Sequence, residues 1–85
     1  MPGIMHPTVN LNGTSKDELR AQASAAVTAV RNAIEALQAA GPNGRDYQLG
    51  PGTYAIARDQ HAARWNALNN VLSELSEIEE KLWDL

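Results

Sequence analysis

Seven side chains in this sequence carry donors, charges or rings suited to holding an anion. They are Asn12, Thr14, Ser15, Arg45, Tyr47, His61 and Arg64. An arginine presents a planar fork of donors that matches phosphate or carboxylate, and a tyrosine ring offers a face for a base. Hydroxyl and amide groups hydrogen-bond polar edges. The seven residues form the predicted ligand site.

Three of the seven belong to the segment 10–15 (Asn-Leu-Asn-Gly-Thr-Ser), directly before the first long apolar stretch. Free backbone N–H groups at a helix N-terminus favour anions, and a glycine there allows close approach. Thr14 and Ser15 add hydroxyl groups. The commoner explanation is a well-made N-cap with no ligand, and it is favoured for this segment.

Arg45 and Tyr47 lie in the segment 42–47 (Pro-Asn-Gly-Arg-Asp-Tyr), inside a longer run of turn-forming residues at 41–52. The Asn-Gly pair predicts a tight turn, because both residue types tolerate positive φ. Twelve residues exceed what a helical connection needs, and long loops are often functional. Two interpretations are equally weighted: a binding loop, or a solvated loop whose tyrosine covers an open bundle end.

His61 and Arg64 occupy positions where leucine or isoleucine would stabilise a helical bundle better. If the helices pair symmetrically about the loop, His61 lies near Arg31 and Thr28. The structural interpretation is a polar layer that fixes register. The functional interpretation is a cluster with Arg31 and Arg58 that faces an anionic ligand. For the histidine alone the structural interpretation is favoured, and for the cluster the two are balanced.

Composition excludes most other chemistry. The chain of 85 residues has no cysteine, and its two histidines, His6 and His61, have no suitably spaced acidic partner for a metal. It has no phosphate-binding glycine loop and no nucleophile elbow. A net charge of −3 argues against nucleic-acid binding. We therefore expect no enzyme activity, no metal and no cofactor.

The first long element is a helix predicted over 15–40. Ser15 as N-cap with Glu18 three residues later forms a capping box, and Gly41 is expected as the C′ glycine. Apolar residues recur three and four positions apart and so form a heptad seam, a line along one face of the helix. Val27 and Ile34 lie beside this line and widen the apolar face. The seam consists of Leu19, Ala23, Ala26, Val30, Ala33, Leu37 and Ala40.

A second helix is predicted over 53–84, beginning with Pro51 in its first turn or Thr53 as its cap. Its seam consists of Tyr54, Ala57, His61, Arg64, Leu68, Val71, Leu75, Ile78, Leu82 and Leu85, flanked by Trp65 and Leu72. The sequence thus predicts an all-α protein. An arm (1–14) precedes an antiparallel helical hairpin joined by the loop 41–52.

The hairpin is expected to assemble into a helical-bundle homo-oligomer. The chain is 44% hydrophobic, but much of that is alanine, so a lone hairpin buries little area. The longer second helix is also expected to overhang at its C-terminus, leaving Leu82, Trp83 and Leu85 with nothing opposite. No apolar run approaches the roughly 18 residues of a membrane span. A cytoplasmic protein is expected.

Taken together, the segments 10–15, 42–47 and 60–64 (Gln-His-Ala-Ala-Arg) resemble a set of small phage-encoded proteins of unassigned function. The resemblance implies a bacterial-virus accessory protein that acts in the host cytoplasm. In size and expected architecture the chain is also similar to phage sponge proteins, which sequester nucleotide-type immune signals. That second similarity is one of architecture, not of motifs.

Two functional hypotheses follow. In the first, an oligomer binds a small nucleotide-derived anion between protomers without turning it over. Arg45, Arg64 and His61 would hold phosphates, Tyr47 would stack on a base, and Asn12, Thr14 and Ser15 would bind polar edges. In the second, the hairpin is a protein-interaction module, a host-enzyme inhibitor or a phage assembly factor, that acts through helix–helix packing.

Overall fold

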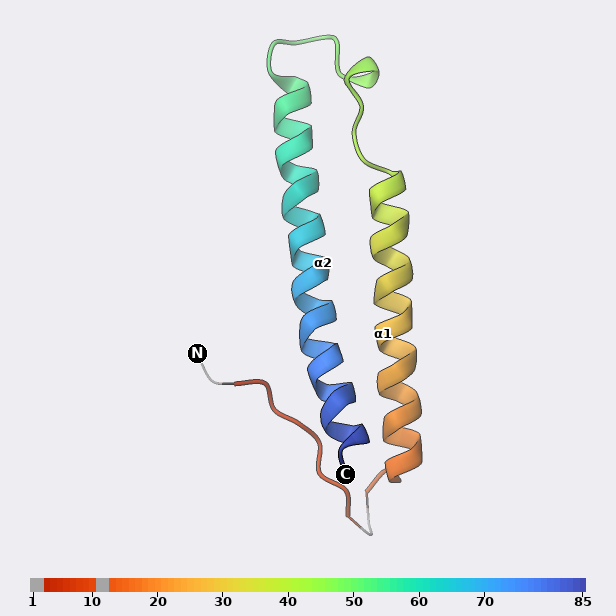
Figure 1. Ribbon diagram of the computed structural model, residues 1–85. Coiled ribbons are helices and arrows are strands. Elements are labelled where there is room, and N and C mark those ends of the chain that lie inside the picture. Colours follow the sequence, from red (N-terminus) through yellow and green to blue (C-terminus); the bar gives the residue numbers. More distant parts are fainter. Residues whose placement is uncertain (1–2, 11–12) are drawn as a thin grey trace.

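Two long helices make up most of the chain. The computed structural model describes residues 3–10 and 13–85, with α1 over Lys16–Ala39, a 3-10 helix over Gly44–Asp46 and α2 over Thr53–Trp83. Within this part of the chain there is no strand, and α1 packs against α2 (Figure 1). The prediction of an all-helical protein with two helices in contact is confirmed.

The two ends of α1 are formed differently. At the start, Ser15 Oγ accepts a hydrogen bond from the Glu18 backbone N–H at 3.1 Å, as an N-cap does. At the end, the expected C′ conformation of Gly41 is absent, since Gly52 has the only positive φ among the described residues. The helix instead tightens, with the Ala40 N–H reaching Leu37 O at 3.1 Å.

The start of α2 is held by the preceding loop. Its N-cap is Gly52, with a φ of 76° that favours glycine. Thr53, one of the expected caps, does not cap the helix. Its hydroxyl lies 3.1 Å from the carbonyl oxygen of Tyr47 and 3.0 Å from that of Gly50. The loop is thereby fastened to the first turn of α2.

The helices run in opposite directions, and contacts at both ends of α1 fix their register (Figure 1). Near its start, Arg20 Nε donates to the carbonyl oxygen of Leu82 at 3.0 Å. Just past its end, a Cβ added to Gly41 would lie 3.3 Å from His61 Nε2, so the ring rests against the glycine. The expected pairing of His61 with Arg31 is wrong.

Matching of apolar residues explains this register. The expected pairing about the loop would set Leu68 near Ser24 and Leu75 near Glu18, an apolar side chain against a polar one each time. The observed contacts are Arg20 with Leu82 and Gly41 with His61. Counting seven residues inward from them along each helix brings each leucine level with a β-branched residue. Leu68 is level with Ile34, and Leu75 is level with Val27.

Each helix therefore contributes one packed column, meaning a set of residues seven apart that faces the other helix. The α1 column is Arg20, Val27, Ile34 and Gly41, and the α2 column is His61, Leu68, Leu75 and Leu82. Among the described residues the buried side chains are Val27, Ile34 and Leu82. The expected α1 seam is thus displaced, because the residues thought to flank it occupy the line of contact.

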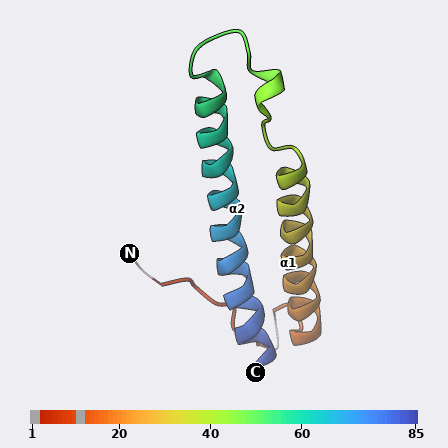
Figure 2. The same cartoon turned by 45° about the horizontal axis from the view of Figure 1, so that its top comes forward.

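The molecule is long and thin (Figures 1 and 2). Its extents are 61 × 27 × 19 Å and its radius of gyration is 18.2 Å, against about 12 Å for a compact domain of this length. Its accessible surface is 6406 Å², about 1,500 Å² more than the scaling for compact monomers of this mass gives. The homo-oligomer stays a prediction.

Candidate functional site

His61 is half-buried on the inner side of α2 and ends the packed column there. Its ring lies against Gly41 and makes no hydrogen bond to the described residues. In the observed register Arg31 is level with Val71, which is ten residues from His61 and thus about 15 Å further along α2. The structure does not bring His61 and Arg31 together.

The other two arginines of the expected cluster are also separate from His61. Arg58 Nε lies 3.6 Å from Asp59 Oδ1 on the surface, with its guanidinium 6.0 Å from the Tyr54 ring centroid. Arg64 is exposed and makes no ion pair or hydrogen bond with the described residues. Within one chain these arginines form no anion-binding cluster.

The loop 40–52 has more structure than its sequence predicts. Asn43 does not take a positive φ. It is extended, with a φ of −131°, and caps the 3-10 helix Gly44–Asp46. Its Oδ1 accepts from the Arg45 backbone N–H at 2.9 Å and from Arg45 Nε at 3.2 Å. The carboxamide therefore positions an exposed guanidinium at this end of the molecule.

Tyr47 follows the 3-10 helix and lies beside α2. Its ring centroid is 6.4 Å from that of Tyr54, at an interplanar angle of 44°. Such a tilted arrangement is favourable for aromatic pairs. About two fifths of each ring residue is exposed, Tyr47 at 39% and Tyr54 at 37%. Both rings can therefore contact a further molecule while they pack together.

The predicted residues before α1 lie at the opposite end of the hairpin. Asn12 is outside the described residues. Thr14 and Ser15 are exposed, and Ser15 Oγ is engaged by the Glu18 N–H. The 24 residues of α1, about 36 Å of helix, separate this end from the loop. One chain cannot join the two halves of the predicted site.

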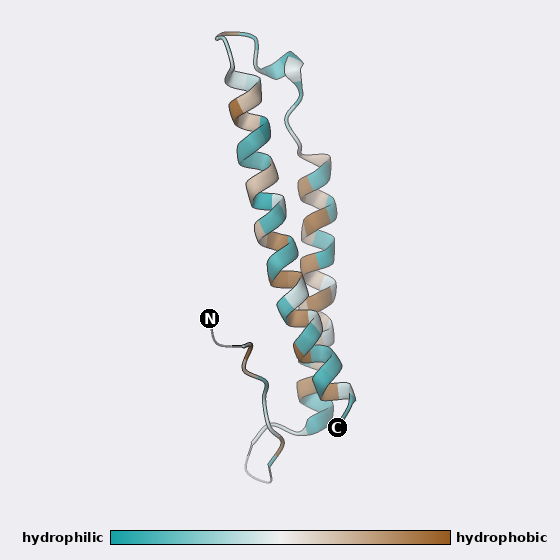
Figure 3. Cartoon of the chain, turned by 60° about the vertical axis from the view of Figure 1, so that its left-hand side comes forward, coloured by the Kyte–Doolittle hydropathy of each residue, from teal (hydrophilic) through white to brown (hydrophobic). Residues whose placement is uncertain are grey.

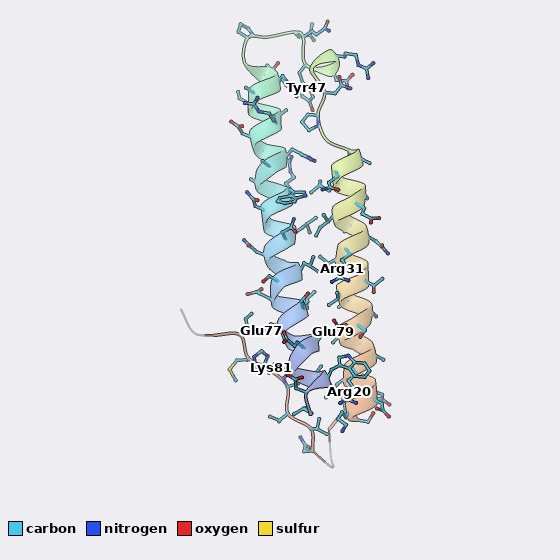
Figure 4. All side chains as sticks on the ribbon, viewed as in Figure 1. Arg20, Arg31, Tyr47, Glu77, Glu79 and Lys81 are labelled. Carbon is cyan, nitrogen blue, oxygen red and sulfur yellow. The ribbon has the colours of Figure 1, made fainter. Side chains whose placement is uncertain are left out.

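The C-terminal end of α2 is tied down, which contradicts the expected overhang. Leu82 is 2% exposed, and the Arg20 guanidinium lies 4.5 Å from the centroid of the Trp83 ring. Lys16 Nζ reaches the carbonyl oxygen of Leu85 at 3.5 Å. Figure 4 shows Arg20 at this end, far from Tyr47 at the other. The overhanging segment is the start of α2.

Sequence reasoning missed Arg20 as a structural residue. A signal was present, because Arg20 lies seven residues before Val27 and fourteen before Ile34 in one column. Its alkyl stem continues that column while its guanidinium reaches the last turn of α2, where free carbonyl groups accept hydrogen bonds.

No cleft or cavity is found in the part of the chain that the structure describes. The same part holds no group of three or more histidine or acidic side chains placed for a metal ion. None of its helices is long and apolar enough to cross a membrane. Comparison of the chain with protein-family models, curated proteins and solved structures finds no match.

Replacing Arg20 by alanine tests the fixed end of the hairpin. Loss of its hydrogen bond and its contact with Trp83 should lower the free energy of unfolding by about 1–2 kcal/mol. The matched control is Arg31→Ala, since Arg31 is on the same helix and is exposed without an ion pair to the described residues. Urea unfolding followed by circular dichroism measures both, and equal losses would contradict the assignment.

Proposed function

We propose that this protein is a non-catalytic interaction module that acts by packing helices against another polypeptide chain. The observation that carries the proposal is the small core. Among the described residues only three side chains are buried, and the apolar residues of the neighbouring columns are half-buried or exposed. A two-helix scaffold of this kind stabilises itself by completing a bundle. The absence of a cleft in the described residues also favours a surface function.

Part of the remaining apolar surface lies on one side of the helix pair, in the columns next to the packed ones. On α1, Ala23, Val30 and Leu37 follow the packed column by three residues and are half-buried. On α2, Arg64, Val71, Ile78 and Leu85 follow its packed column by three residues. Because the helices are antiparallel, both columns lie on the same side. We call this surface the open face, defined by those seven residues.

The opposite side of the helix pair is polar on α1 and partly apolar on α2. There the α1 residues four after the packed column are Ser24, Arg31 and Gln38. The matching residues on α2 are Trp65, Leu72 and Glu79. Figure 3 shows hydrophobic segments recurring along both helices between hydrophilic ones. A second helical chain on the open face would cover Val71 and Leu85, which are 42% and 59% exposed, and would remove that apolar surface from water.

The expected assembly is concentration dependent. Light scattering should give a mass of at least twice the 9.2 kDa of one chain, and Val30→Glu should return the protein to one chain because it places a charge on the open face. Ala29→Glu is the matched control, since Ala29 is exposed on α1 away from that face. Far-ultraviolet circular dichroism checks that both variants are helical. Undiminished association of the Val30 variant would contradict the proposal.

A second candidate function is retention of a nucleotide-derived anion between protomers, as in an accessory protein of a phage in its host cytoplasm. Two observations support it. Arg45 is exposed, is positioned by Asn43 and has no ion pair among the described residues. Tyr47 and Tyr54 present partly exposed ring faces nearby. An arginine fork and aromatic faces are the groups that bind phosphate and base.

This candidate predicts ligand-induced stabilisation. Cyclic dinucleotides, cyclic trinucleotides and ADP-ribose should be screened by thermal shift and by calorimetry. Arg45→Ala should weaken binding of an active ligand at least tenfold, because a phosphate would lose a bidentate partner. Arg58→Ala is the control, a nearby exposed arginine that lies close to its own carboxylate. No stabilisation of the intact oligomer by any of these compounds would exclude this function.

A further inference from the structure

The distribution of charged residues along α2 indicates which partner fits the open face. In the first half of α2, Arg58 and Arg64 accompany the single acid Asp59. In the last half and its C-cap, five acids accompany the single base Lys81, and they are Glu74, Glu77, Glu79, Glu80 and Asp84. The helix is thus basic near its start and strongly acidic near its end, with Val71 between the two halves.

This asymmetry distinguishes the two ways of pairing two copies of α2. A parallel pair would bring the acidic ends together, and like charges at that separation repel. An antiparallel pair brings the basic half of one helix against the acidic half of the other. We propose that the open face binds a second copy of this chain with the two α2 helices antiparallel, and with Val71 next to the twofold axis. The inference rests on the proposed function and names its partner.

The residues fit the symmetry of such a pair. A twofold axis at Val71 sets Arg64 level with Ile78 of the partner subunit, next to Glu77 of the partner subunit. Arg64 has no ion pair among the described residues of its own chain, so the partner supplies the carboxylates that it lacks. The same patch serves both copies, as a twofold interface requires.

The surface area also agrees with a dimer. The chain exposes 6406 Å², about 1,500 Å² above the compact value for its mass. A standard interface covers about 800 Å² on each partner, so one such contact removes roughly half of that excess. Val71 is 42% exposed and Leu85 is 59% exposed in the single chain. Both belong to the column that the partner would cover.

The pairing has a consequence for the candidate ligand site. With Val71 on the axis, the start of α1 near Ser15 comes level with Tyr54 of the partner subunit. Tyr54 lies beside Tyr47, on the same loop as Arg45. The two groups of predicted ligand residues, which one chain holds at opposite ends, would then lie at the same end of the dimer.

Single-cysteine variants test this geometry, because the natural chain has no cysteine. A disulfide forms only where two Cα atoms come within about 7 Å. In glutathione buffer, Val71→Cys should cross-link two chains at least ten times faster than Ile56→Cys. Ile56 is the matched control, since it is 58% exposed on α2 and lies off the open face.

Arg64→Cys separates the two orientations. In the antiparallel pair the two copies of residue 64 are fourteen helical positions apart, about 21 Å, so this variant should not cross-link above the Ile56 control. A mixture of Arg64→Cys and Ile78→Cys chains should form the mixed disulfide instead. Fast self-cross-linking of Arg64→Cys would establish a parallel pair and overturn the inference.

The mass of the uncross-linked protein keeps the two proposals apart. A dimer in which Val71→Cys cross-links no faster than Ile56→Cys overturns the antiparallel geometry and leaves the interaction module standing. A mass of one chain at every concentration, with no rapid cross-linking, overturns self-association through the open face altogether.

Discussion

The alignment of the two helices is the constraint on which the other features depend. Arg20 meets Leu82 at one end and Gly41 meets His61 at the other. Twenty-one residues, three heptads, separate Arg20 from Gly41 and also His61 from Leu82. Val27 and Ile34 therefore match Leu75 and Leu68 between those ends. Any other alignment would lose at least one of these apolar pairs, and full burial of one such side chain is worth roughly 1.5–3 kcal/mol.

From this alignment follow the shape of the loop end and the position of the open face. The first turns of α2 extend beyond the end of α1, so residues 40–52 run alongside them. Thr53 and Tyr54 hold that segment through the backbone and ring of Tyr47. Because the closest packing follows one line of each helix, the columns three residues later stay half-buried on α1 and mostly exposed on α2. The contacts at both ends of the hairpin and the position of the open face therefore both result from the alignment of the helices.

Much of the architecture could be predicted from residue types. Ser15 with Glu18, and the turn formers from Gly41 to Gly52, bracket two helices that the structure contains. The alignment could not be predicted, because heptad patterns repeat and several alignments satisfy them. Choosing symmetry about the loop put Leu82 and Trp83 in an overhang, whereas Arg20 binds there. Loop conformation was also missed, since Asn43 acts through its side chain and not through positive φ.

The candidate ligand site illustrates a second limit of sequence reasoning. Arg45 and Tyr47 lie on one loop, and the structure gives each a defined neighbour there, Asn43 and Tyr54. His61 and Arg64 were singled out because they break an apolar pattern. A break in the apolar pattern does not show whether the residue faces the other helix or the solvent. His61 ends the packed column beside Gly41, and Arg64 is exposed on the open face. Their separate roles depend on helix alignment, which the pattern leaves open.

The most direct test of that alignment is a pair of spin-label distances. Labels at Gln22 and Glu80, both exposed, are level in the observed register, whereas Gln22 and Asn70 are offset by ten residues, about 15 Å. In samples diluted with unlabelled chain, double electron–electron resonance should give a shorter distance for 22–80 than for 22–70. A shorter 22–70 distance would show pairing symmetric about the loop and would contradict the account.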